Sequence, residues 1–132
     1  MTEKTMACKA LAAMFKNHGD PNDLQITFVA NAAMELGLDN KEADEVMQVL
    51  REGGDYQSFI GGINSKAVKT FFFRRVVAAT LLDEQIEDEE LKLIYDTAQM
   101  LAFNKDAVDE YLEWMKEGIA WDKRGIAIAG KL

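Results

Sequence analysis

The sequence predicts an all-α fold, a compact bundle of about seven helices. Apolar residues recur at three- and four-residue steps through most of the chain, which is the period of helices that bury one face. A single proline interrupts the 132 residues, and no segment alternates polar and apolar residues as a half-buried strand would. A chain of this length buries roughly two thirds of the surface that its unfolded form exposes. We therefore expect residues 1–132 to form one helical domain.

The first two helices are separated by a turn that contains the proline. Apolar positions in residues 6–15 follow the helical period, and the Gly19–Pro21 segment ends this helix. Asp20 is predicted to cap the next helix with Pro21 at its first position, where a missing N–H costs nothing. That second helix runs to about Leu36.

Glycines mark the ends of the next elements. Gly37 suits a left-handed C-terminal position, and Asp39 or Asn40 is expected to cap a third helix that stops at Gly53. Residues 55–64 are predicted to form a loop or a short helical turn. A long fourth helix then runs from residue 64 or 65 to residue 82.

Three further helices are expected after the acidic segment 83–90. The fifth begins near Asp88 and carries an apolar stripe through Ala102. Asn104 caps the sixth, Gly118 closes it, and residues 119–131 form a shorter last helix.

The chain contains an internal repeat. A shift of 65 residues aligns residues 24–53 with residues 89–118 without a gap, and apolar positions stay apolar. Paired polar residues match as well, since Asp44-Glu45 aligns with Asp109-Glu110. The repeat predicts two related three-helix units, at about 6–53 and 65–118, and pseudo-twofold architecture.

Charge and composition exclude several function classes. The net charge of −8 and the pI near 4.6 argue against nucleic acid as a ligand, because phosphate binding needs a cationic surface. Cations or basic proteins are the expected ligands instead. The start of the chain lacks the features of a signal peptide, and its most apolar window is too short to span a bilayer and contains two arginines. We expect a cytoplasmic protein without membrane insertion.

The segment 83–90 is the candidate metal site. It holds six carboxylates in eight residues, which repel one another unless cations are near. If a cation binds, Asp83, Glu84, Glu87 and Glu90 are the ligands, and their hard oxygens favour Ca²⁺ or Mg²⁺, bound weakly. The alternative is that these residues complement the N-terminal dipole of the next helix and bind nothing. The central glycine and the ligand spacing of an EF-hand are not present.

A basic and aromatic segment is the candidate partner-binding site. It comprises the run Phe71-Phe72-Phe73 and the cations Lys66, Lys69, Arg74 and Arg75. Three consecutive phenylalanines span about 200° of a helix, so one of them is expected off the core face. Phe72, Arg74 and Arg75 are therefore predicted to contact a protein partner, or a second subunit in a homodimer.

Catalysis is not expected. His18, the only histidine, sits in a turn where a helix-end role is the ordinary one, and Cys8 lies about 15 Å from it along a helix. Ser58 and Ser65 lack the surroundings of a serine nucleophile. No phosphate-binding loop is present.

The segment 77–91 resembles the tellurite-resistance TerB family. Asp83, Ile86 and Glu90 match that family's acidic turn and the glutamate that opens its next helix, and Met34-Glu-Leu-Gly-Leu38 matches a helix end in the first repeat. Glu84 stands where the family prefers glycine. The resemblance covers most of the chain and implies a bundle of about seven helices without known catalysis. It also implies an acidic surface linked in some members to divalent cations, and a role in stress-response or surface-associated complexes. The alternative function is an adaptor or structural module without a metal.

Overall fold

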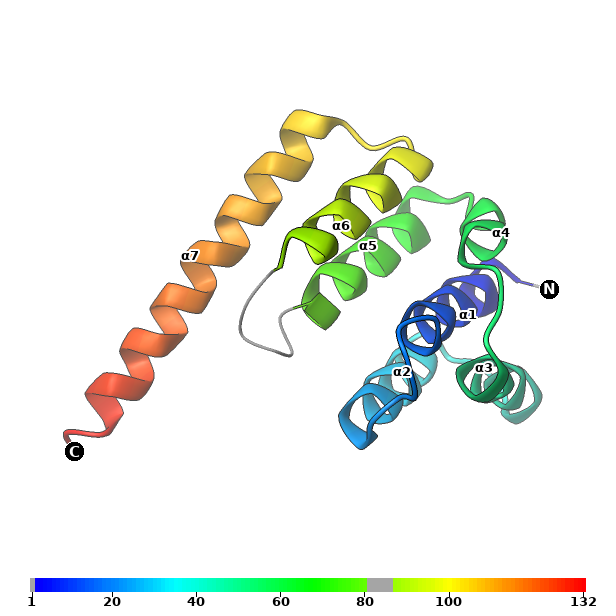
Figure 1. Ribbon diagram of the computed structural model, residues 1–132, viewed down its shortest axis with the longest axis horizontal. Coiled ribbons are helices and arrows are strands. Elements are labelled where there is room, and N and C mark those ends of the chain that lie inside the picture. The colour runs from blue at the N-terminus through cyan, green and yellow to red at the C-terminus, as the bar shows by residue number, and fades with distance from the viewer. Residues whose placement is uncertain (1, 81–86) are drawn as a thin grey trace.

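The chain folds into helices only. The computed structural model describes residues 2–80 and 87–132, and within these ranges it contains no strand (Figure 1). The helices are α1 (Glu3–Lys16), α2 (Asp23–Glu35), α3 (Asn40–Glu52), α4 (Tyr56–Gly61), α5 (Lys66–Thr80), α6 (Asp88–Met100) and α7 (Lys105–Ala129). The predicted all-α bundle of about seven helices is confirmed.

Helix α1 lies at the centre of the first half of the bundle. It packs against α2, α3, α4 and α5 (Figure 1). Six of its apolar residues have no exposed surface: Ala7, Cys8, Ala10, Leu11, Ala12 and Ala13. A helix that is apolar nearly all round must be covered on every side, and small alanine side chains let its neighbours approach closely. Its one buried cation, Lys9, pairs with Glu45 of α3 at 3.4 Å.

Most helices begin at a short polar side chain that accepts a backbone N–H. The caps include Asn22 of α2, Asp39 of α3, Asp55 of α4 and Asn104 of α7. The predicted caps Asp39 and Asn104 are confirmed.

The prediction that Asp20 caps the second helix was wrong. Asn22 is the cap, because it forms a reciprocal pair of hydrogen bonds with Gln25 three residues later, and such a pair satisfies two free N–H groups. Asp20 instead accepts a hydrogen bond from the Lys16 ammonium at 2.7 Å.

Helix boundaries coincide under the 65-residue shift. The shift carries α2 onto α6 from end to end, and the first residue of α3 onto the first residue of α7. The turns between these helices also agree. Leu38 N–H donates to Ala33 O at 3.1 Å, and Phe103 N–H donates to Ala98 O at 2.9 Å.

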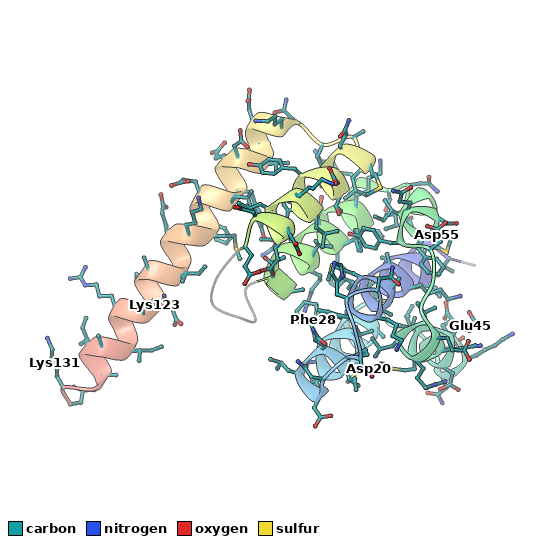
Figure 2. All side chains as sticks on the ribbon, viewed as in Figure 1. Asp20, Phe28, Glu45, Asp55, Lys123 and Lys131 are labelled. Carbon is teal, nitrogen blue, oxygen red and sulfur yellow. The ribbon has the colours of Figure 1, made fainter. Side chains whose placement is uncertain are left out.

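Helix α7 continues far past its counterpart α3. The predicted helix end at Gly118, and the separate helix over residues 119–131, were wrong, since α7 runs unbroken to Ala129. A glycine ends a helix by adopting a left-handed conformation, and Gly118 does not adopt it. The second half of α7 extends beyond the ends of α5 and α6 (Figure 1). Lys123 lies on it and Lys131 follows its end, both away from the other helices (Figure 2).

Within the described residues, no helix has both the length and the apolar character that crossing a bilayer requires.

Candidate functional site

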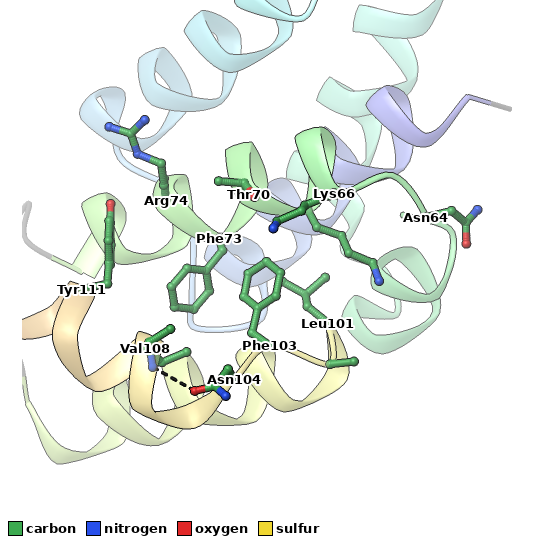
Figure 3. Close-up of a pocket in the computed structure, with 13 residues that line it drawn as sticks. Asn64, Lys66, Thr70, Phe73, Arg74, Leu101, Phe103, Asn104, Val108 and Tyr111 are labelled. Carbon is green, nitrogen blue, oxygen red and sulfur yellow. Dashed lines mark hydrogen bonds between the residues drawn. The ribbon is translucent and has the colours of Figure 1, made fainter.

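A groove with a volume of about 540 Å³ lies between α5, the first turns of α7 and the turn that joins α6 to α7 (Figure 3). We call it the α5–α7 groove. Side chains of α5 form one wall, from Lys66 to Arg74, and the first two turns of α7 form the other, through Tyr111. The volume falls within the range of sites that hold a small ligand or a few side chains of a partner.

Aromatic rings form the floor of the α5–α7 groove. Phe73 is almost fully buried and meets the half-buried Phe103 edge to face, with ring centroids 5.4 Å apart and an interplanar angle of 83°. Tyr111 lies next to Phe73 at 5.9 Å, and Trp114 lies next to Tyr111 at 5.6 Å. The four rings form a continuous line from the α6–α7 turn along α7. Such rings offer a large apolar contact area at fixed positions.

Cations form the rim of the α5–α7 groove. Lys66, Lys69 and Arg74 lie on one face of α5, and Lys66 and Arg74 are exposed. Lys66 and Arg74 are separated by about 12 Å along the helix axis at 1.5 Å per residue. Among the described residues, none of these three cations forms an ion pair with a carboxylate. The rim is therefore a local positive surface on a protein of net charge −8.

The end of the groove is fixed by the start of α7. The Asn104 side chain accepts the Ala107 N–H at 3.1 Å, which holds the first turn of the helix (Figure 3). Ala102, in the preceding turn, has a positive φ of 59°. This turn places Phe103 directly over Phe73.

The described lining of the groove combines cations and hydroxyls with apolar surface. Of the described residues that line it, none is a carboxylate, an imidazole or a thiol. Thr70 and Tyr111 supply the hydroxyls. Cations beside an aromatic floor suit a ligand that carries negative charge and apolar groups together.

The groups with shifted pKa values lie outside this groove. Burial raises the pKa of the Cys8 thiol to about 12 and raises the pKa of the Tyr56 hydroxyl. The Asp109 carboxylate accepts a hydrogen bond from the Tyr95 hydroxyl at 2.5 Å, which raises the tyrosine pKa and lowers the aspartate pKa. Burial in the core causes the first two shifts, and a hydrogen bond between α6 and α7 causes the other two.

The predicted partner-binding residues separate into three environments. Phe72 is completely buried and packs beside Tyr56 at 6.2 Å, so no partner reaches it in this structure. Arg75 forms an ion pair with Glu35 of α2 and lies over the ring of Phe71 at 4.9 Å. Only Arg74 lies at the α5–α7 groove.

Of the four predicted metal ligands, only Glu87 and Glu90 belong to the described residues. Asp83 and Glu84 lie outside those residues. Glu87 is exposed, and the Glu90 carboxylate accepts the Glu87 N–H at 3.1 Å, as expected for side chains that open a helix. In residues 2–80 and 87–132, no three His, Cys, Asp or Glu side chains are arranged to hold a metal ion.

A second cavity of about 400 Å³ lies beside Glu87 and Glu90, where the end of α1 meets the ends of α5 and α6. Its lining includes His18 and Asp20 from the first inter-helix turn, together with Glu89. The described lining therefore joins the turn after α1 to the first turns of α6. His18 Nδ1 lies 2.7 Å from Met14 O, in the helix-end position expected from the sequence.

No known protein family, curated protein or solved structure matches the chain significantly. The functional interpretation therefore depends on the geometry of the chain itself.

Phe103 and Tyr111 are the groove residues that sequence reasoning missed. Both belong to helical apolar patterns that predict core positions, and both are half-buried. The available signal was the repeat, since it places Phe103 in a tight inter-helix turn, where a large ring reaches a neighbouring helix.

Proposed function

We propose that this chain is a non-enzymatic interaction module whose α5–α7 groove binds an acidic, aromatic-containing segment of a protein partner. The observation that carries the proposal is the set of three unpaired cations directly above a line of aromatic rings. The module corresponds to the adaptor alternative that the sequence allows.

Charge favours an acidic segment. In the described part of the chain, six ion pairs join other lysines and arginines to carboxylates, whereas Lys66, Lys69 and Arg74 have none. A carboxylate that approaches this rim gains attraction without breaking an existing pair. The rest of the acidic surface repels the same segment, so the groove is its preferred contact.

Shape favours a segment with an apolar side chain. Phe73 and Phe103 already contact each other, and beside the half-buried rings of Phe103 and Tyr111 the groove leaves a space that an aromatic or branched aliphatic side chain fills. Buried aromatic contacts dominate the energetics of such interfaces. The cations then orient the segment and provide selectivity.

Fluorescence polarisation with labelled peptides tests this proposal. The probes are a peptide that alternates Asp or Glu with Phe or Trp, and its counterpart with Lys at each acidic position. We expect the acidic peptide to bind and the basic one not to bind. Lys66→Glu and Arg74→Glu should each weaken binding about tenfold, and added salt should weaken it further.

Lys41→Glu is the matched control, because Lys41 is an exposed cation on α3, away from the groove. It should leave the affinity unchanged. Equal binding of both peptides, or equal effects of all three charge reversals, would overturn the proposal.

Weak binding of Ca²⁺ or Mg²⁺ is the second candidate function. It is favoured by the second cavity, where Asp20, Glu87, Glu89 and Glu90 line one space. Calorimetric titration of the full chain with each ion is the test. Heat that disappears when Asp83, Glu84, Glu87 and Glu90 are replaced by alanine supports the site. An absence of heat, or heat that survives these replacements, contradicts it.

The TerB-like family is part of the proposal. The seven helices and the coincidence of α2 with α6 under the 65-residue shift support it, as does the shared geometry of the two inter-helix turns. A stress-response role in the cytoplasm belongs to the same proposal. Deletion of the gene followed by growth on tellurite, with localisation of a tagged chain, tests both parts.

A further inference from the structure

The second half of α7 contains a seven-residue repeat. Residues 114–120 read Trp-Met-Lys-Glu-Gly-Ile-Ala, and residues 121–127 read Trp-Asp-Lys-Arg-Gly-Ile-Ala. In a helix, a seven-residue repeat returns each residue to nearly the same face, which is the pattern by which two helices pack along their length. The repeat forms one stripe, which we call the tryptophan stripe: Trp114, Gly118, Trp121, Gly125 and Ile128.

The tryptophan stripe has no partner within the described chain. The exposed fractions of its large side chains are 57% for Trp114, 79% for Trp121 and 50% for Ile128. From Gly118 to the end of the chain, every residue except Ile119 is exposed. This part of α7 extends away from the other helices (Figure 2).

We propose that the tryptophan stripe binds a second copy of this chain, with the two α7 helices antiparallel and a twofold axis near Ile119. In this register Trp121 of each copy packs against Gly118 of the other, and Trp114 packs against Gly125. Tyr111 faces Ile128 across the same interface. The interface is isologous, since each copy contributes the same surface.

Side-chain size selects this register. Large and small residues alternate along the tryptophan stripe, and the antiparallel arrangement places each indole opposite a glycine. Apart from the backbone of its own helix, a Cβ added at Gly118 or Gly125 would meet no atom of the described residues within 4 Å, so nothing in the described part of one copy requires glycine at these positions. A facing helix does, because the missing side chains leave the holes that the two indole rings enter.

Charge selects the antiparallel direction. Four exposed charges are spaced at seven-residue intervals, and their sign changes halfway: Glu110, Glu117 and Arg124 lie along one edge of α7, and Lys131 follows two residues after its end. Antiparallel pairing places Glu117 beside Arg124 of the other copy and Glu110 beside Lys131, twice each. Parallel pairing instead brings Glu117 toward Asp122 of the other copy, which is repulsive. The charges on this edge therefore attract those of a second copy only when the two α7 helices are antiparallel.

The mass of the full chain in solution tests the inference. Sedimentation equilibrium should show a concentration-dependent species of twice the chain mass of 14.8 kDa. Trp121→Ala should weaken the dimer at least about a hundredfold, because the interface loses two buried indoles. The variant should keep the wild-type circular dichroism spectrum, since the Trp121 side chain is 79% exposed in the monomer.

Charge reversal tests the direction. Glu117→Arg and Arg124→Glu should each weaken the dimer about tenfold or more, since each creates two like-charged contacts. An equimolar mixture of the two variants should form a heterodimer with near wild-type affinity, because all four contacts are then opposite in sign. Lys123→Glu, on the opposite side of the helix, is the matched control and should have no effect.

Other outcomes overturn the inference. A chain that is monomeric at hundreds of micromolar has no such interface. A dimer that the charge reversals do not weaken, or that mixing does not restore, uses another surface or direction. A monomer that co-sediments with phospholipid vesicles through Trp121 would assign the stripe to a lipid surface instead. Lys66→Glu and Arg74→Glu should leave the dimer unchanged, so failure of this inference and failure of the proposed groove function are distinguishable.

Discussion

Ala102 ends α6 in the same left-handed conformation that Gly37 adopts at the end of α2. The φ angles are 59° for Ala102 and 71° for Gly37. Each N–H donates to the carbonyl three residues earlier, at 3.0 Å in both turns. The second turn therefore has the geometry of the first, although alanine stands at the position where glycine is favoured. A left-handed conformation costs a residue with a Cβ about 1–2 kcal/mol.

Exchange of the residues at these two turns should change stability in opposite directions. Gly37→Ala should lower the free energy of unfolding by about 1 kcal/mol, because the new Cβ is strained at this φ. Ala102→Gly should raise the free energy of unfolding, because glycine relieves the left-handed strain. The gain should be smaller, at most about 0.5 kcal/mol, because glycine also gives the unfolded chain more entropy. Urea unfolding monitored by circular dichroism measures both.

Gly61→Ala is the control for the turn exchange. Gly61 is the last residue of α4 and has no positive φ, and an added Cβ would meet no described atom within 4 Å. Alanine should be neutral or stabilising there. Equal effects at Gly37 and Gly61 would show that left-handed strain does not govern the inter-helix turns.

Local signals in the sequence were sufficient to predict where several helices begin and end. Asp39 and Asn104 are predicted as caps because a cap depends on residues within one turn of it. Gly37 is predicted as a helix end for the same reason. Gly118 carries the same local signal, yet α7 continues through it, because the residues that follow Gly118 also favour a helix. Whether a helix ends at a glycine therefore depends on the residues that follow the glycine as well as on those that precede it.

The candidate site depended on contacts that sequence could not supply. The run Phe71-Phe72-Phe73 shows that α5 has more apolar surface than one core face needs, but not which rings are covered. In the structure α5 lies between α1 and α6 and also faces α7, so Phe72 and Phe73 are both buried, on different sides. Arg75 could not be assigned either, since its partner Glu35 comes from a helix 40 residues away.

The hydrogen bond between Tyr56 and Thr97 should be important for stability. The two hydroxyl oxygens are 2.7 Å apart and join α4 to α6, and Thr97 has no exposed surface. Tyr56→Phe leaves the buried Thr97 hydroxyl without this partner and should cost about 1–2 kcal/mol. Urea unfolding measures the loss.

A double-mutant cycle isolates this hydrogen bond. In Tyr56→Phe/Thr97→Val neither hydroxyl remains, so no polar group is left buried alone. The double variant should lose less stability than the sum of the two single variants, by about 1 kcal/mol. Strict additivity would mean that the hydroxyls do not interact in solution.

Cys8 should react only when the chain unfolds. It is completely buried in α1, and burial raises its pKa from 9.0 to about 12. At pH 8 the folded chain then holds about a thousandfold less thiolate than the unfolded chain, and the thiolate is the reactive form. We expect modification by Ellman's reagent to be at least about a hundredfold slower in buffer than in denaturant. Rapid modification under native conditions would contradict the central position of α1.

The same pKa shift gives a stability change at alkaline pH. The folded-state pKa is above the unfolded value, so the stability associated with the neutral thiol is complete below pH 9 and is lost as the pH rises toward 12. The stability of Cys8→Ala should fall less steeply over this range. Parallel curves for the two proteins would exclude Cys8 as the cause.

Glu42 should stabilise the chain only when it is ionised. Its carboxylate accepts two hydrogen bonds, from the Thr5 hydroxyl at 2.7 Å and from the Asp39 N–H at 3.2 Å, and the first of them joins the start of α1 to the start of α3. They lower the Glu42 pKa below 4.5, with the Thr5 hydroxyl as the larger cause. For a lowered pKa, the stabilisation is present above the unfolded value and is lost as the pH falls through the folded value.

Thermal unfolding of Glu42→Gln between pH 3 and pH 7 tests this assignment. Glutamine keeps the size and one carbonyl acceptor but not the charge. The wild-type Tm should exceed the variant Tm by a few degrees at pH 7, and the difference should disappear as the pH falls below 4.5. Asp44→Asn, at an exposed position on the same helix, is the charge-matched control. A Tm difference that stays constant across this pH range would mean that Glu42 acts through packing and not through its ionised hydrogen bonds.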